Sequence, residues 1–140
     1  MTTDHERRRR NAATLDVYFE RLSALDVETW IELWAEDCTQ IMPFAAGGLP
    51  GTVRGKEQVR ALYQGMADGY SELRFTDLEV LPLGDAHKVF ARWRPRGTFL
   101  DGTPYANENA ALFEFDDDGR IVVFTEYFNP LIVLEHFPSN

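Results

Sequence analysis

The chain has 140 residues, of which 44% are hydrophobic and 13% aromatic, and its formal net charge at pH 7 is -9. This length fits a single domain, residues 1–140, with a core large enough to fold without disulfides. The acidic balance excludes nucleic acid and anionic membranes as expected partners, because both require a basic face. The single cysteine, Cys38, cannot form an internal disulfide, and the start of the chain lacks an apolar targeting segment, so we expect a cytoplasmic protein.

Helical periodicity dominates the first half of the chain. Apolar residues recur every three or four positions over residues 4–25, which predicts an amphipathic helix whose arginine-rich start faces water. Asp26 is a typical N-cap for a second helix, which we expect to end near Asp37. The same spacing between Gly55 and Gly69 predicts a third helix.

Alternation with a period of two replaces the helical pattern after Ser71. It predicts four long strands, over residues 73–82, 87–99, 103–115 and 120–128. Two short extended segments are expected earlier in the chain, at 39–44 and 52–54. Gly-Asp and Asp-Gly pairs at the junctions are typical of the turns in an antiparallel meander. Pro95 cannot donate a ladder hydrogen bond, so we expect the sheet to bend there. The fold class is therefore α+β, a cone-shaped barrel of three N-terminal helices on a strongly curved antiparallel sheet, with residues 135–140 as a tail.

The last predicted strand carries the strongest candidate for chemistry, Glu126. This residue alternates with Phe124 and Phe128 on one strand face. If that face lines a cavity, desolvation raises the pKa of the carboxyl, which can then take up and return protons near neutral pH. The alternative is a glutamate at a strand end that faces water or pairs with an arginine.

The other face of the same strand carries Ile121, Val123, Thr125 and Tyr127, so both faces are largely apolar. An antiparallel sheet that is exposed on one side normally alternates apolar and polar residues. The pattern therefore indicates that a second copy of the sheet covers this face, and we expect a homodimer.

Several polar and aromatic residues are candidates for holding a small organic ligand. Asn107, Asn109 and Tyr105 either orient a substrate carbonyl or satisfy the backbone of a loop. The aromatic candidates are ordinary core residues individually, but together they can line a pocket for a flat ring: Tyr18, Trp34, Phe44, Tyr63, Trp93, Phe124 and Phe128.

Other charged residues carry weaker signals. Arg92 and Arg94 share a strand face and can clamp a carboxylate, although pairing with surface carboxylates is the favoured interpretation. Asp77 is a second acid/base candidate only if its side chain turns inward, and a solvated position is favoured. The three histidines lack ligand spacing, so we expect no metal site.

Three segments carry a family resemblance: RRRNAATLDVYF, YANENAALFEF and GRIVVFTEYFNP. With the order of helices before sheet, they resemble the nuclear transport factor 2-like superfamily, especially SnoaL-like polyketide cyclases and phenazine-biosynthesis A/B proteins. The resemblance implies a conical α+β barrel, usually a homodimer, with an acid/base pocket and generally no cofactor. It also implies that Glu126, within EYFNP, is the acid/base residue.

The family's histidine on the first long strand is replaced by Thr76, which implies a different substrate. The resulting hypothesis is a cofactor-independent isomerase or cyclase that acts on a small, cyclic natural-product intermediate, with Glu126 as proton shuttle. The alternative is a non-catalytic small-molecule-binding protein of the same fold. The paired Asp and Arg of related epoxide hydrolases are not recognisable, so that activity is disfavoured.

Overall fold

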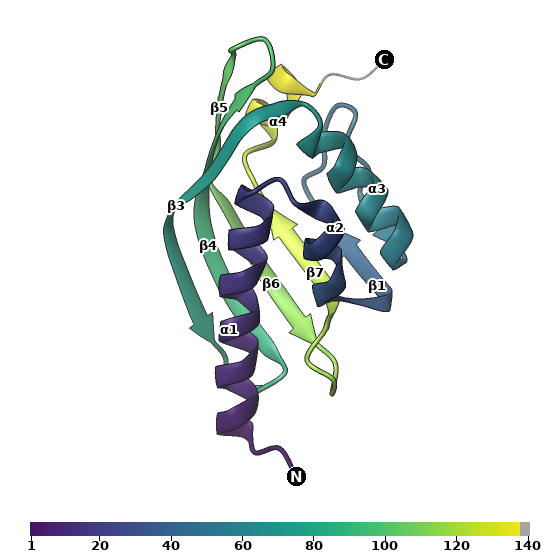
Figure 1. Cartoon of the computed structure of the whole chain (residues 1–140), viewed down its shortest axis with the longest axis vertical. Helices are drawn as coiled ribbons and strands as arrows, with labels where there is room; N and C mark the ends of the chain where they lie inside the picture. Colours follow the sequence, from purple (N-terminus) through teal and green to yellow (C-terminus); the bar gives the residue numbers. More distant parts are fainter. Residues whose placement is uncertain (138–140) are drawn as a thin grey trace.

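The helices of the chain lie on the concave side of one strongly curled sheet (Figure 1). The computed structural model describes residues 1–137. The helices in this range are α1 (Asp4–Ser23), α2 (Val27–Trp30), the 3-10 helix η1 (Ile31–Leu33), α3 (Lys56–Ala67) and α4 (Pro130–His136). None of these described helices is long and apolar enough to cross a membrane.

The α1 helix is the longest helix and follows the predicted pattern. The Thr3 side chain caps it by accepting a hydrogen bond from the Glu6 amide at 3.1 Å. Its buried stripe includes Leu15, Tyr18 and Phe19, which pack into the core. The amphipathic helix predicted from residue 4 is confirmed, and it ends two residues earlier than expected.

The prediction of a second helix that ends near Asp37 is correct only for its first turns. Asp26 caps α2 as expected, by accepting a hydrogen bond from the Thr29 amide at 3.2 Å. The chain then leaves helical conformation, and a strand begins at Trp34 instead of a helix continuing to Asp37. The reason is tertiary, because this strand pairs with the C-terminal strand of the sheet, and Trp34 aligns with Ile121.

The sheet contains seven strands in the order β2-β1-β7-β6-β4-β3, with β5 paired to β4. Their bounds are β1 (Trp34–Ile41), β2 (Thr52–Arg54), β3 (Tyr70–Pro82), β4 (Lys88–Phe99), β5 (Pro104–Ala106), β6 (Asn109–Phe115) and β7 (Ile121–Tyr127). The predicted meander from β3 to β7 is antiparallel. However, β1 runs parallel to β7, so the sheet is mixed instead of wholly antiparallel.

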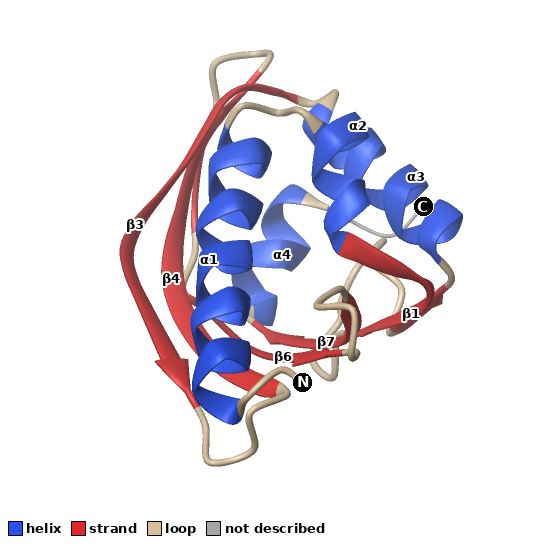
Figure 2. Ribbon diagram, turned by 60° about the horizontal axis from the view of Figure 1, so that its bottom comes forward, coloured by secondary structure: helices blue, strands red, loops and turns tan. Residues whose placement is uncertain are grey.

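The pairing of β4 changes at Pro95, the residue where the sequence predicts a bend. On one side of this residue β4 pairs with β6, and on the other side it pairs with β5. The predicted strand over 103–115 is therefore broken into two. In β3 the register shifts between Thr76 and Glu79, where Asp77 has a positive φ of 56°. Figure 2 shows the strands curving around the helices as a result.

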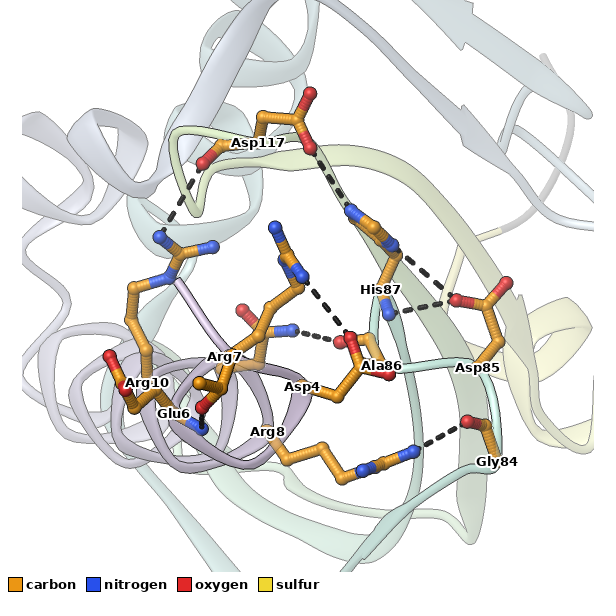
Figure 3. Close-up of polar contacts among 12 residues, drawn as sticks. Asp4, Glu6, Arg7, Arg8, Arg10, Gly84, Asp85, Ala86, His87 and Asp117 are labelled. Carbon is orange, nitrogen blue, oxygen red and sulfur yellow. Dashed lines mark hydrogen bonds and ion pairs between the residues drawn. The ribbon is translucent and has the colours of Figure 1, made fainter. Parts of the chain in front are cut away.

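The arginine-rich start of α1 is attached to the sheet instead of facing water throughout. Arg8 donates hydrogen bonds to the backbone carbonyls of Leu83 and Gly84 at the β3–β4 turn, and Arg10 donates to that of Asp117 in the β6–β7 turn at 3.4 Å (Figure 3). Of the four arginines at positions 7–10, only Arg9 is exposed. The run therefore helps to hold α1 across the sheet.

The α4 helix was not predicted, because residues 135–140 were expected to form a tail. Asn129 caps the helix by accepting a hydrogen bond from the Leu131 amide at 3.0 Å, and Pro130 occupies the first helical position. Residues 138–140 lie outside the described part of the chain. The helix brings the buried side chain of Val133 against the core between the sheet and the other helices.

Candidate functional site

A small cavity lies between the helices and the concave face of the sheet. Its volume is about 90 Å³. Most of its wall is apolar, with side chains from α1, α3, β3, β4 and α4. The polar groups on the wall are Tyr18, Gln40, Tyr63, Tyr70, Tyr105, Asn109 and Glu126. An apolar cavity with a few polar groups is the usual form of a small-molecule site.

Glu126 lies on this wall because β7 directs it to the same face as Phe124 and Phe128. Its Oε2 accepts a hydrogen bond from Nδ2 of Asn109 at 3.1 Å, and Nε2 of Gln40 lies 3.5 Å from Oε1. Burial raises the pKa of Glu126 from 4.5 to about 7, and the hydrogen bond from Asn109 partly opposes that shift. Both protonation states of the carboxyl are therefore populated near neutral pH.

Gln40 connects Glu126 to two buried tyrosines. This fully buried residue on β1 donates from Nε2 to the Tyr63 hydroxyl at 2.7 Å. The Tyr63 hydroxyl in turn shares a hydrogen bond with that of Tyr18. Burial, together with the nearby Glu126 carboxyl, raises the pKa of both tyrosines well above the usual value, so both hydroxyls keep their protons. A continuous polar chain runs from α1 to β6 through the cavity wall.

Gln40 was not predicted as a site residue, although its position in the sequence carries a signal. Cys38, Gln40 and Met42 alternate on one side of the predicted extended segment. A lone cysteine is usually a buried residue, and Cys38 is buried, so the residue two positions later should also face inward. A polar residue on a buried strand face needs hydrogen-bond partners, so its presence there indicates a polar site inside the fold.

The structure brings together seven of the candidate residues that the sequence analysis named. They are Tyr18, Tyr63, Trp93, Tyr105, Asn109, Glu126 and Phe128, all on the cavity wall. Trp34 and Phe124 instead pack against each other in the core, with ring centroids 5.6 Å apart, and neither lines the cavity.

Phe44, Thr76 and Asn107 also lie off the cavity wall. Phe44 is 54% exposed because β1 ends before it, and its ring packs on Tyr127 outside. The Thr76 hydroxyl points across the strands to the Arg94 carbonyl at 3.4 Å. Asn107 instead satisfies the backbone of a loop, because its Oδ1 accepts a hydrogen bond from the Asn129 amide at 3.1 Å.

The arginines considered as a carboxylate clamp form ion pairs outside the cavity. Arg92 pairs with Glu79 at 2.7 Å, and Arg94 pairs with Glu108 at 2.9 Å and Asp77 at 3.6 Å. The favoured interpretation of surface pairing is confirmed. Within residues 1–137, no group of three or more His, Cys, Asp or Glu side chains is arranged to hold a metal ion.

Replacing Asn109 with alanine should raise the pKa of Glu126 above its value of about 7. The reason is that the variant removes the hydrogen bond that favours the ionised carboxylate, while the burial remains. The measurement is a ¹³C NMR titration of the Glu126 carboxyl carbon. Thr125→Ala, on the opposite strand face, should leave the titration unchanged. A Glu126 pKa that stays the same or falls in the Asn109 variant would contradict this assignment.

The fold and the cavity define a class: cone-shaped α+β proteins that enclose a carboxyl group in a small apolar pocket. The chain belongs to the SnoaL-like domain family, which it matches over residues 15–124. The family resemblance inferred from the sequence is therefore confirmed.

Individual relatives agree with this assignment. The chain is 31% identical over 128 residues to the uncharacterized protein YesE of Bacillus subtilis (strain 168), covering 89% of this chain and 84% of that protein. A solved structure of a Bacillus subtilis protein named as a candidate isomerase superposes with a TM-score of 0.83 at 28% identity, covering 96% and 95% of the two chains. A phenazine biosynthesis-related protein of Pseudomonas aeruginosa gives 0.77 at 22% identity, covering 94% and 83%, which shows a shared fold.

Proposed function

We propose that this protein is a cofactor-independent isomerase or cyclase that binds a small, cyclic natural-product intermediate and uses Glu126 as its proton shuttle. The observation that carries the proposal is the position of Glu126, which is the only carboxyl on the wall of the described cavity. Its pKa of about 7 suits a group that must both accept and donate a proton.

The geometry supports a two-step proton transfer. The ionised Glu126 removes a proton from a carbon next to a substrate carbonyl, and the electron pair of that C–H bond moves onto the carbonyl oxygen as an enolate. The protonated carboxyl then returns the proton to another carbon of the conjugated system. The Tyr105 hydroxyl is suited to stabilise the enolate oxygen, because it accepts a hydrogen bond from Asn107 at 3.0 Å and keeps its own proton free to donate.

The proposal predicts exchange of substrate protons with solvent. Small cyclic ketones incubated with the protein in D₂O should incorporate deuterium next to the carbonyl faster than in buffer, as followed by ¹H NMR. Glu126→Gln should lose the acceleration by about 100-fold or more, the usual contribution of a positioned acid/base group. Glu28→Gln makes the same chemical change at an exposed position and should keep full activity. Equal exchange by wild type and Glu126→Gln would refute the role of this carboxyl.

The alternative is a non-catalytic binding protein, and one observation favours it. Within the described cavity no histidine accompanies Glu126, so a single carboxyl would have to perform every proton transfer. On this alternative Glu126 is a hydrogen-bond acceptor for the ligand. Ketones would then bind to the wild type without any Glu126-dependent exchange.

We also propose that two copies associate through the outer face of the sheet. Leu112, Val123 and Thr125 are only partly buried there, and Tyr127 beside them is 38% exposed. Ile121, expected on the same face, is instead buried in the core, because the β6–β7 register shifts next to it. Sedimentation velocity at micromolar concentration should show a dimer, and Leu112→Arg should give a monomer because it places a charge in the apolar contact. Leu100→Arg, in an exposed turn, should remain dimeric. A wild-type monomer would exclude the association.

A further inference from the structure

Among residues 1–137, no positively charged side chain lines the cavity. Its ionisable residues are Glu126 and four tyrosines, Tyr18, Tyr63, Tyr70 and Tyr105. Burial raises the pKa of every one of these tyrosines, so they remain neutral at physiological pH. The wall therefore carries either no charge or the single negative charge of Glu126.

Two cationic side chains that follow or precede wall residues in the chain, Arg96 and His136, make other contacts. Arg96 donates from Nη1 to the backbone carbonyls of Pro95 and Asn107 at 2.9 and 3.1 Å. The ring of His136 meets that of Tyr105 edge to face, with centroids 5.3 Å apart, and does not line the cavity. Neither side chain faces the space beside Glu126.

A carboxylate ligand would find no compensating partner in this cavity. Moving an ionised group out of water into an apolar site is strongly unfavourable unless a counter-charge or several donors meet it. A second carboxylate beside Glu126 would add repulsion between like charges. A neutral ligand avoids both costs and can still hydrogen-bond to the tyrosine hydroxyls.

The size of the cavity limits the ligand further. Its volume of about 90 Å³ is well below the roughly 300 to 1,000 Å³ of pockets for drug-sized molecules. A compact molecule, with about one ring, fits this space better than an extended polycyclic one.

We infer that the cavity takes an uncharged, single-ring compound bearing a hydroxyl or carbonyl oxygen and excludes carboxylate anions. The inference rests on the proposed function, which places the ligand beside Glu126. It extends that function by naming the charge and size of the substrate.

Three probes that share one ring and differ in charge can test this inference: phenol, benzoate and benzylammonium. At about pH 8 the first is neutral, the second an anion and the third a cation. Each is titrated into ¹⁵N-labelled protein while the side-chain amide signals of Gln40 and Asn109 are followed by NMR. We expect phenol to bind at least about tenfold more tightly than benzoate, while benzylammonium tests whether the ionised Glu126 selects a cation instead. The Gln64 amide, which binds Asp68 on the surface of α3 at 2.8 Å, is the internal control and should not shift.

The variant Glu126→Gln provides a second measurement. It removes the one negative charge, so benzoate should gain affinity relative to phenol, while Glu28→Gln should change nothing. Benzoate binding as tightly as phenol, or benzylammonium binding more tightly, would overturn the inference.

Failure of the inference can be distinguished from failure of the proposed function. Equal binding of phenol and benzoate, together with Glu126-dependent deuterium exchange, would refute only the charge selection. Absence of any shift at Gln40 and Asn109 with all three probes would refute the inference whatever the exchange shows. Selective phenol binding without exchange would support the inference and favour the binding-protein alternative.

Discussion

Replacing Glu126 with glutamine should stabilise the protein increasingly as the pH rises. The pKa of this carboxyl is about 7 in the folded protein, against an ordinary value of 4.5. Between these values the unfolded chain has released the proton and the folded chain still holds it, so ionisation favours unfolding. At 1.36 kcal/mol for each pH unit, the wild type should lose about 3 kcal/mol relative to the variant between about pH 4.5 and pH 7. Below this range the difference should be constant.

The measurement is urea denaturation of both proteins across this pH range. The difference in the free energy of unfolding isolates Glu126, because the other titrating groups are common to both proteins. The groups that face it, Tyr18, Tyr63 and Tyr105, have raised pKa values and stay neutral. A difference for Glu126→Gln that does not vary with pH would mean that this carboxyl titrates normally.

Replacing Phe113 with alanine should produce a large loss of stability. This side chain is fully buried. Its ring centroid lies 4.6 Å from that of Phe124 and 5.4 Å from that of Tyr18. Truncation removes these contacts and leaves a void, so we expect a decrease of about 3 to 5 kcal/mol in the free energy of unfolding.

Phe44→Ala is the matched control for this substitution. Phe44 is 54% exposed, so the same truncation should cost less than about 1 kcal/mol. Urea midpoints of the two variants, measured at one pH, give the comparison. Similar losses at both positions would contradict the assignment of Phe113 to the core.

Local periodicity was sufficient to predict most of the fold. The helical spacing in α1 and α3 and the alternation in β4 and β7 depend on neighbouring residues only. The boundary at Trp34 could not be predicted, because Trp30, Ile31 and Trp34 satisfy a helical pattern equally well. The strand there is stabilised by parallel pairing with β7, which is distant in sequence and leaves no local signal.

Part of the candidate site could also be predicted from local alternation in the sequence. Glu126 and Asn109 reach the cavity because regular alternation places them on inward strand faces. Thr76, identified through the family resemblance, faces away from the cavity, where Phe75 is the inward neighbour. Gln40 belongs to β1, whose burial depends on the parallel pairing that was not predicted.

The amide of Gln40 has a consequence for how the site accommodates a moving proton. Its nitrogen lies 3.5 Å from Glu126, while its own Oε1 is buried without a hydrogen-bond partner. A primary amide presents a donor and an acceptor of nearly equal shape, and half a turn about its terminal bond exchanges them. The nitrogen suits the ionised carboxylate, and the oxygen suits the protonated acid. The Gln40 side chain can thus hydrogen-bond to either protonation state of Glu126 by rotating its amide, without any displacement of the strands that hold it.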